Sequence, residues 1–518
     1  MNQPIYLVFS RLILQAKLRE ATRFITQRGE KSSVLKPDDD DGKGNTVKDV
    51  LEFKHPPQAE SSPEAFVDCE VLPILIDIDV TGSHVHKVAK TLSGSAGIGG
   101  LDSQQWQSLL LKFGNASDSL REAVAALTRR LANTLVPCED IRALKAKRLI
   151  ALDKSPGVCP IGIGEVLDRL CAKIMIEITG DDVQQVCLAD QLASGIRSGI
   201  EGAIHAFSDL FEDLSGDGWG LLLIDATNAF NSISRTACLW NARVLWPRCS
   251  RFLFNSYQGF AVLFIAGSKV FLLSREGVTQ GDPLAMLFYG IGVLPLTRML
   301  KKPDLWKQNW YADDSGCLGL FANLRQWLQL LLEEGPKFGY FPEPDKSYLV
   351  VHPDFVDIAK EHFKDFNINI VTGQRFLGGF IGSSIDTESW LQNKITSWLK
   401  AISSLTAASV DYPQAAFISF TKSLQNEWSF IQRVLLGFET QFSVLKEAIR
   451  NEFLSTLLAL DLSEQEKGVL CRPTHFVGIG ILDPVQTALW QHSNSRTATE
   501  SIILALKNGT TLDINESS

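Results

Sequence analysis

Two adjacent aspartates, Asp313 and Asp314, constrain the fold of this chain more than any other feature, because apolar segments flank them on both sides. Residues 305–310 and 315–320 combine aromatic, aliphatic and small residues, a pattern that predicts a β-hairpin with both carboxylates at its turn. Adjacent carboxylates repel each other, so either water at an exposed turn or a divalent cation must offset the repulsion. Alone, the pair is typical of a solvated turn, and the choice between water and metal depends on the rest of the chain.

The composition is that of a globular protein with several structural units. A length of 518 residues suffices for about two to four units, and 45% hydrophobic and 21% charged residues are ordinary values. The formal net charge of -9 means that any nucleic-acid contact must come from local clusters of Lys and Arg. Nine cysteines without a CxxC pair predict a reduced, intracellular protein of the cytoplasm and/or nucleus, without a zinc module. We expect neither a signal peptide nor a membrane span.

A third carboxylate, Asp225, ends a continuous apolar run. Residues 219–224 predict a buried central strand from whose end Asp225 emerges, and residues 226–232 predict a turn into a helix. Carboxylates from a strand end and a facing hairpin suit phosphoryl transfer assisted by two Mg²⁺ (or Mn²⁺) ions about 3.5–4 Å apart. One ion would lower the pKa of an attacking hydroxyl and the other would stabilise a leaving pyrophosphate. Asp225, Asp313 and Asp314 provide the ligands that this chemistry needs.

Two further segments fit the same chemistry. Residues 261–265 and 269–274 predict a second hairpin, and Gln280-Gly281-Asp282-Pro283 then opens an apolar helix whose first N–H groups can receive an anion. Residues 141–175 carry seven Lys and Arg against three acidic residues, which indicates a channel for a template or a triphosphate. The alternative for this basic stretch is that its Lys and Arg stems only cover an ordinary helix.

The order of these motifs resembles the palm of reverse transcriptases and is most similar to those of non-LTR, LINE-type retroelements. The resemblance covers roughly residues 85–385, and its segments are Asp225 with Phe230, Gln280-Gly281-Asp282-Pro283, Tyr311-Ala312-Asp313-Asp314, residues 339–347, the primer-grip segment Phe376-Leu377-Gly378-Gly379, Pro160-Ile161-Gly162 in the fingers, and residues 97–102.

The resemblance implies an α+β fold, a right-hand polymerase with fingers, a βαββαβ-type palm and a helical thumb. The expected ranges are an N-terminal extension with linker (1–75), fingers with the basic segment (76–218), the palm with the catalytic motifs (219–385), the helical thumb (386–470) and a C-terminal tail (471–518).

The resemblance also implies roles for individual residues. The expected metal ligands are Asp225, Asp313, Asp314 and the backbone carbonyl of Ala226. Phe230 would block a ribose 2′-OH and so select dNTPs, although a buried aromatic under the palm would account for it nearly as well. Gln280 and Gly281 would line the nucleotide and template. Lys346 would protonate the pyrophosphate, its alternative being an exposed turn lysine.

The chain departs from the family in the fingers. Cys159 stands where the family usually has an arginine that grips the triphosphate or template, and Asp168 lies in a segment that is commonly more basic. Loss of a charge-assisted contact weakens nucleotide binding. Lys154 or Arg169 is the expected replacement.

These residues together predict an RNA-directed DNA polymerase that uses an RNA template, a DNA primer or nicked target DNA, and dNTP substrates. We find no ribonuclease H constellation and no endonuclease module in the sequence, so a separate endonuclease or other element protein is an expected partner. Two alternatives remain open. One is a catalytically decayed palm that only binds nucleic acid, and the other is an RNA-templated RNA polymerase, which Phe230 disfavours.

Overall fold

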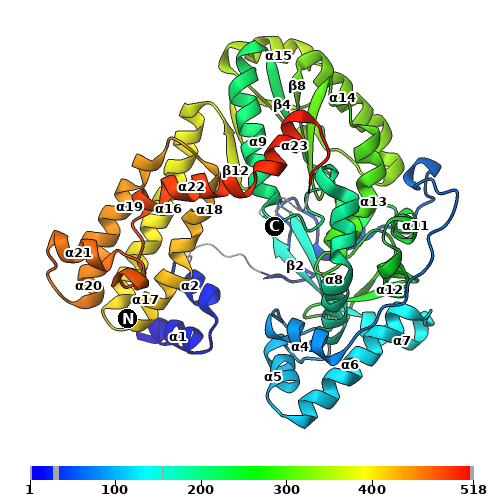
Figure 1. Cartoon of the computed structure of the whole chain (residues 1–518), viewed down its shortest axis with the longest axis horizontal. Helices are drawn as coiled ribbons and strands as arrows, with labels where there is room; N and C mark the ends of the chain where they lie inside the picture. The colour runs from blue at the N-terminus through cyan, green and yellow to red at the C-terminus, as the bar shows by residue number, and fades with distance from the viewer. Residues whose placement is uncertain (1–2, 27–33, 155–156, 514–518) are drawn as a thin grey trace.

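The computed structural model describes residues 3–26, 34–154 and 157–513, which form two lobes. One lobe is built on two five-stranded sheets covered by helices, and the other is made of helices (Figure 1). The predicted α+β, right-hand fold is confirmed at this level. Within the described ranges, no helix is both long and apolar enough to cross a lipid bilayer.

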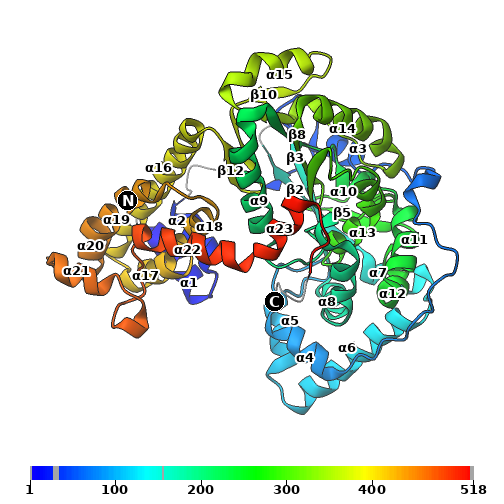
Figure 2. The same cartoon turned by 45° about the horizontal axis from the view of Figure 1, so that its top comes forward.

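The palm sheet has the strand order β10-β9-β4-β8-β7. Along the chain its elements follow the predicted βαββαβ order, with a further strand, β10, parallel to β9 at the edge (Figure 2). The elements are β4 (Trp219–Ile224), α13 (Ala285–Met299), β7 (Trp306–Tyr311), β8 (Asp314–Leu320), α14 (Phe321–Glu334), β9 (Tyr348–Val351) and β10 (Asn369–Val371).

Both faces of the palm sheet are buried, which explains the continuous apolar run of β4. Leu222 and Ile224 lie in one core with α13 and α14, whereas Leu221 lies in the other with α9 (Gly199–Leu214). Successive side chains of a strand point to opposite faces, so a strand with two covered faces must be apolar at every position.

The fingers sheet has the order β1-β2-β5-β6, and β3 pairs with the other edge of β2. The predicted hairpin at 261–274 forms, but it joins the fingers sheet and not the palm, because β5 pairs in parallel with β2. The strands are β1 (Val34–Leu35), β2 (Lys147–Asp153), β3 (Val158–Gly164), β5 (Ala261–Ile265) and β6 (Phe271–Ser274).

The range predicted as an N-terminal extension has two separate packing partners. Helix α3 (Val47–Phe53) covers the fingers sheet, since Val47 and Leu51 are fully buried against Leu149 and Leu263. The first two helices instead join the helical lobe, through Phe9, Ala21 and Ile25 (blue in Figure 1). The helices of this lobe are α1 (Gln3–Leu14), α2 (Leu18–Thr26), α16 (Ser384–Ser409), α17 (Pro413–Lys422), α18 (Glu427–Val434), α19 (Ser443–Glu447), α20 (Leu454–Leu458) and α21 (Glu464–Leu470).

The range predicted as a C-terminal tail contains two helices that join the lobes, α22 (Pro484–Ala498) and α23 (Glu500–Asn508) (red in Figure 1). Ile502 is fully buried against α9, where a Cβ on Gly202 would lie 2.7 Å from it. Arg496 pairs with both carboxylate oxygens of Asp209 at 2.7 and 2.9 Å. This segment therefore fixes the helical lobe relative to the palm.

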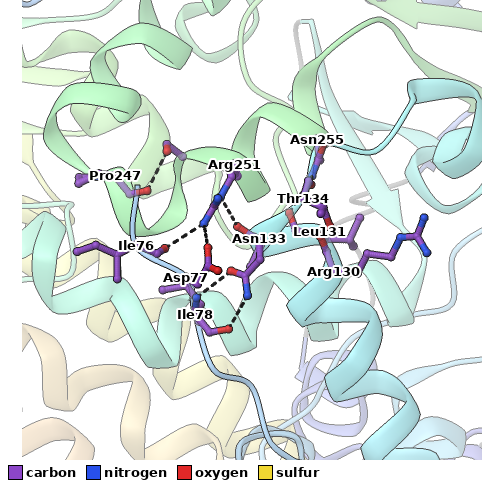
Figure 3. A network of polar contacts seen from close by, with 12 residues as sticks. Ile76, Asp77, Ile78, Arg130, Leu131, Asn133, Thr134, Pro247, Arg251 and Asn255 are labelled. Carbon is purple, nitrogen blue, oxygen red and sulfur yellow. Dashed lines mark hydrogen bonds and ion pairs between the residues drawn. The ribbon is translucent and has the colours of Figure 1, made fainter. Parts of the chain in front are cut away.

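Residues 76–78, at the start of the range predicted as fingers, lie outside any helix or strand and are tied to two helices (Figure 3). The side-chain amide of Asn133 accepts the Ile78 N–H at 2.8 Å and donates to the Ile78 carbonyl at 2.9 Å. Arg251 donates to the Ile76 carbonyl at 3.3 Å and pairs with Asp77. Further helices of the lobe with the two sheets are α4 (Gly82–Lys90), α5 (Ser103–Leu111), α6 (Asn115–Asn133), α7 (Cys138–Lys145), α8 (Val166–Cys187), α11 (Arg235–Leu245) and α12 (Pro247–Tyr257).

Candidate active site

The three predicted carboxylates lie at neighbouring strand ends. Ile224, the last residue of β4, pairs with Ser315, so Asp225 follows beside Asp314, the first residue of β8. Tyr311 pairs with Asp314 across the hairpin, which leaves Ala312 and Asp313 as a two-residue turn. Opposed residues in antiparallel strands have Cα atoms about 4.5–5.5 Å apart. The predicted strand end and hairpin are both confirmed, and they bring Asp225 next to the turn.

The turn itself is held by a buried side chain that the sequence analysis missed. Ala312 has φ +54°, a left-handed conformation that costs a non-glycine residue about 1–2 kcal/mol. The amide of Gln191, 0% exposed, accepts the Ala312 N–H at 2.7 Å and donates to the Ala312 carbonyl at 3.1 Å. Tyr340 Oη donates to the Asp313 carbonyl at 2.9 Å. The sequence signal for this clamp is weak, because Gln191 stands next to another polar residue, Asp190, in the otherwise apolar stretch 188–193.

The same three carboxyl groups have raised pKa values. Burial first, and then the charges of Asp313 and Asp225, raise the pKa of Asp314 to about 6. Burial likewise raises the pKa of Asp313 and of Asp225, with a neighbouring carboxylate adding to each. The Asp314 side chain is open to solvent at the hairpin, yet protein atoms surround it on the other sides, which accounts for both its exposure and its raised pKa.

The donor set fits a hard divalent cation by the type of its ligand atoms. Mg²⁺ and Mn²⁺ take oxygen ligands, and three carboxylates whose ionised forms repel each other gain from such a charge between them. In the described residues, however, no three His, Cys, Asp or Glu side chains already surround one point that could hold an ion. Binding would therefore require the aspartate side chains to rotate toward the ion.

The loop after β4 is fixed by the segment that carries Lys346. Glu343 N–H donates to the Asp225 carbonyl at 2.8 Å, and Asp225 N–H donates to Ser347 Oγ at 3.1 Å. In the part of the chain that the structure describes, no hydrogen bond reaches the Ala226 carbonyl, so this oxygen is available as the predicted fourth ligand. Lys346 pairs with Glu343 at 2.5 Å, and this hydrogen bond raises the pKa of Lys346.

A groove of about 430 Å³ joins the carboxylates to the predicted primer grip. That segment is a hairpin of β11 (Gly373–Phe376) and β12 (Gly379–Gly382), with Leu377 and Gly378 at positive φ in its turn. The groove is lined by Ile200, Leu223, Ile224, Asp225, Tyr311, Asp314, Ser315, Lys346, Tyr348, Gln374, Arg375, Phe376, Leu377 and Gly378. The end of a chain-like substrate fits a groove with carboxylates at one wall and this turn at another.

Phe230 lies beneath the groove and does not line it. Its side chain is 8% exposed and stacks on Tyr289 with ring centroids 4.6 Å apart. Both proposed roles, gate and buried aromatic, are compatible with this position, so the gate remains a prediction.

Gln280 and Gly281 connect the palm to the fingers. Gly162 N–H donates to the Gln280 carbonyl at 2.8 Å, and the Cys159 thiol donates to Gln280 Oε1 at 3.8 Å. Gly281 has φ +102°, and a Cβ there would lie 2.6 Å from the Gly162 carbonyl. Only glycine permits this approach of the two backbones.

Much of the basic stretch at 141–175 serves structure and not a phosphate channel. Lys147 pairs with Asp282 at 2.9 Å and Lys145 with Asp168 at 2.6 Å, and all four side chains are at most 10% exposed. Asp168 is thus the buried counter-ion of Lys145, which explains an acid in a segment that is commonly basic. Asp282 also accepts the N–H of Leu284, the residue just before α13, at 3.0 Å, and the predicted anion site at the start of that helix stays a prediction.

The two candidate replacements for the missing arginine lie in different places. Arg169 donates to the carbonyls of Ser95 at 2.5 Å and Ser93 at 3.5 Å, so it supports the glycine-rich loop. Lys154 is exposed at the β2–β3 turn, and its charge opposes the raised pKa of Asp225, of Asp313 and of Asp314. The charge of Lys154 therefore acts on the carboxylates, whereas Arg169 is bonded to its loop.

Comparison with known proteins gives one relative by sequence. No family model matches the chain. The retrotransposable element SLACS 132 kDa protein of Trypanosoma brucei gambiense is 30% identical over 238 residues, which is 43% of this chain and 19% of that protein. This chain thus spans less than a fifth of that relative's length. The similarity confirms the resemblance to the retroelement kind of reverse transcriptase that the motifs indicate.

Solved structures give remote likenesses. Apo telomerase from Candida tropicalis aligns at 10% identity with a TM-score of 0.38, over 82% of this chain and 78% of that one. Telomerase from Candida albicans in complex with a TWJ fragment of telomeric RNA aligns at 10% identity with a TM-score of 0.34, over 77% and 72% of the two chains.

Replacement of the turn clamp tests its role. Gln191→Leu leaves the Ala312 N–H and carbonyl without partners, and each buried orphan costs about 1–3 kcal/mol. We expect a lower free energy of unfolding and faster hydrogen exchange of the Ala312 amide. Gln432→Leu is the matched control, since Gln432 is 1% exposed and donates to the Pro484 carbonyl at 2.7 Å in the helical lobe. Equal protection of Ala312 in both variants would contradict the clamp.

The carboxylate repulsion predicts a stabilising substitution. In the absence of divalent ions, Asp314→Asn should raise the free energy of unfolding at pH 7, because it removes a charge whose pKa is raised to about 6. As the pH falls below that value, the native protein protonates Asp314 before the unfolded chain does, so the difference from the variant should shrink. Chemical unfolding from pH 8 to 4.5 measures this. Asp304→Asn, at an exposed aspartate, is the control. A variant less stable than the native protein at pH 7 would refute the repulsion.

Proposed function

We propose that the chain is an RNA-directed DNA polymerase that transfers dNMP from a dNTP to a primer 3′-OH. The observation that carries this proposal is the register that sets Asp225 beside Asp314 in the lining of a groove that the β11–β12 turn also lines. The order of the palm motifs along the chain and the similarity to a retrotransposon protein support it. The substrates are an RNA template, a DNA primer or nicked target DNA, and dNTPs.

Each residue of the site has its own role in the proposed reaction. Asp225, Asp313, Asp314 and the Ala226 carbonyl would hold Mg²⁺ or Mn²⁺. The chemistry that such ions supply when bound is activation of the hydroxyl and stabilisation of charge on the pyrophosphate. Gln191 holds the backbone of the hairpin turn, so only the aspartate side chains have to rotate when an ion and a substrate bind. Lys346 stays protonated beside Glu343 and donates a proton to the leaving pyrophosphate.

A second candidate is a palm that binds nucleic acid without extending it. It is favoured by the uncharged Cys159 in the fingers and by the absence of a preassembled ion site in the described residues. The two candidates differ in primer extension. An endonuclease activity would come from another protein or from another part of a longer one.

Primer extension on an RNA template with dNTPs and Mg²⁺ tests the proposal directly. The native chain should extend the primer, and Asp225→Asn should lower the rate by about 10³-fold or more, because metal-assisted stabilisation is worth several kcal/mol. Asp217→Asn is the control, since Asp217 is an exposed aspartate just before the other end of β4 and should leave the rate unchanged. A native chain that binds primer–template without extending it would favour the second candidate.

Nucleotide selection tests the gate. Phe230→Val should raise the kcat/KM for rNTPs relative to dNTPs, because a smaller side chain leaves space for the 2′-OH. Phe→Ala at a buried site costs about 3–5 kcal/mol, so valine is the safer replacement. Tyr289→Phe keeps the stacked ring and should leave selectivity unchanged. An unaltered ratio in a folded Phe230→Val protein would assign Phe230 to the core alone.

A further inference from the structure

An internal segment of the chain exposes a run of apolar side chains. Every aliphatic residue of 71–76 is exposed, Val71 to 83% and Ile74 to 85%, and the others are Leu72, Leu75 and Ile76. Single exposed apolar side chains are common on protein surfaces, whereas a contiguous exposed patch is typical of an interaction site. The segment does not line the groove beside the carboxylates, so the proposed reaction does not account for it.

The backbone of this segment has few partners within the chain. Residues 72–81 belong to no helix or strand. Among the described residues, the only hydrogen bond to a backbone group of residues 68–75 is the one that the Cys69 thiol donates to the Val71 carbonyl at 3.1 Å. The N–H and C=O groups of this stretch can therefore pair with a strand of another protein. Pro73 lacks an N–H, which restricts the segment to the edge of any sheet that it joins.

Both ends of the segment are fixed to helices of the same lobe. The Val67 N–H donates to Asn241 Oδ1 at 2.8 Å, and the Val67 carbonyl accepts the indole N–H of Trp240 at 2.9 Å. At the other end, Ile78 is buried and bonded to Asn133. Between these points the chain runs along the outer side of the lobe (blue, at the right of Figure 2). Fixed ends lower the entropy that the segment loses when it binds a partner.

The charge around the segment indicates the chemistry of this partner. Residues 66–83 contain no Lys, Arg or His, and their four acidic residues are all exposed: Asp68, Glu70, Asp77 and Asp79. Asp77 pairs with Arg251 and Asp79 with Arg129 at 3.8 Å. Among the described residues, Asp68 and Glu70 have no ion pair. A partner with basic side chains beside its binding groove would therefore be attracted.

The same charges disfavour two other occupants. Antiparallel pairing of the segment with a second copy of itself would place the acidic residues before it in one copy against those after it in the other, and like charges on opposed strands are destabilising. An anionic lipid surface would repel the acidic residues as well. Because the segment is internal, modules that bind the end of a chain are also excluded.

We propose that residues 71–76 dock by strand addition on a small ubiquitin-like modifier, a compact β-sheet domain with an open edge, an apolar groove beside that edge and basic residues around the groove. The aliphatic side chains would enter the groove, the backbone would pair with the open edge, and the acidic residues would face the basic ones. The inference goes beyond the polymerase reaction and does not depend on it. Docking there would attach the chain to proteins that carry the modifier and would leave the groove beside the carboxylates open.

Titration of the full chain into a fluorescently labelled small ubiquitin-like modifier tests the contact. The native chain should bind with a Kd in the micromolar range. Ile74→Asp should raise the Kd by about 10-fold or more, because a charge would enter an apolar groove. Val410→Asp is the matched control, since Val410 is 68% exposed at the end of α16 in the helical lobe, and it should keep the native Kd. No binding by the native chain, or an equal Kd in both variants, would overturn the proposal.

Backbone pairing has its own readout. Binding of the modifier should slow hydrogen exchange of the amides of residues 71–76, whereas the amides of Ile74→Asp should stay unprotected at the same modifier concentration. Binding by the native chain without protection of these amides would overturn strand addition.

The acidic residues are tested by reversal of their charge. Asp68→Lys combined with Glu70→Lys should raise the Kd by about 10-fold and reduce its dependence on salt, because the attraction to the basic groove is lost. Asp304→Lys, at an exposed aspartate elsewhere in the same lobe, is the control and should leave the Kd unchanged. An unchanged Kd in the double variant would contradict the charge complementarity on which the choice of partner rests.

Self-association is measured on the same proteins by sedimentation velocity. The native chain and Ile74→Asp should have the same oligomeric state without the modifier. An assembly of the native chain that Ile74→Asp dissociates would assign the segment to an interface between copies and overturn the proposal.

Discussion

The carboxylates of Asp225, Asp313 and Asp314 repel one another, and the structure around them keeps them together. The pairing of β4 with β8 fixes two of them side by side, and the two-residue turn fixes the third. Both faces of the sheet are buried, so the strands cannot slip by one residue without exposing a core. Gln191 then holds Ala312 in a left-handed conformation. Strained backbone conformations and repelling charges are found mainly at functional sites. A cation bound between these carboxylates would offset their repulsion.

Contacts between distant segments bring the other parts of the chain to this sheet edge. The buried pair of Lys147 and Asp282 and the close approach of Gly281 to Gly162 join the fingers to the palm. Removal of one partner of such a buried pair leaves an uncompensated charge, so the pair fixes the relative position of the two parts. Helices α22 and α23 connect the helical lobe to α9 on the other side of the palm. The groove beside the carboxylates is bounded by elements that these contacts hold in place.

The parts of the fold that could be predicted are those with a local signal. The apolar run before Asp225 and the hairpin at Asp313 each follow from a few neighbouring residues, whereas the turn at Gly378 followed from the resemblance to the family. The rest depends on partners far along the chain. The pairing of β5 with β2, the docking of α3, and the clamp from Gln191 leave no periodic pattern in the sequence. The basic stretch was misleading because the counter-ion Asp282 lies 135 residues from Lys147.

The central claim is that Asp225 and the turn at Asp313 and Asp314 hold divalent cations. The most direct measurement is X-ray diffraction at the manganese absorption edge from crystals of the full chain with primer–template, dNTP and Mn²⁺. The account predicts anomalous density bounded by the carboxylates of Asp225 and Asp314, with those side chains rotated toward it. Bound nucleotide without anomalous density at these carboxylates, or with manganese bound only elsewhere, would contradict it.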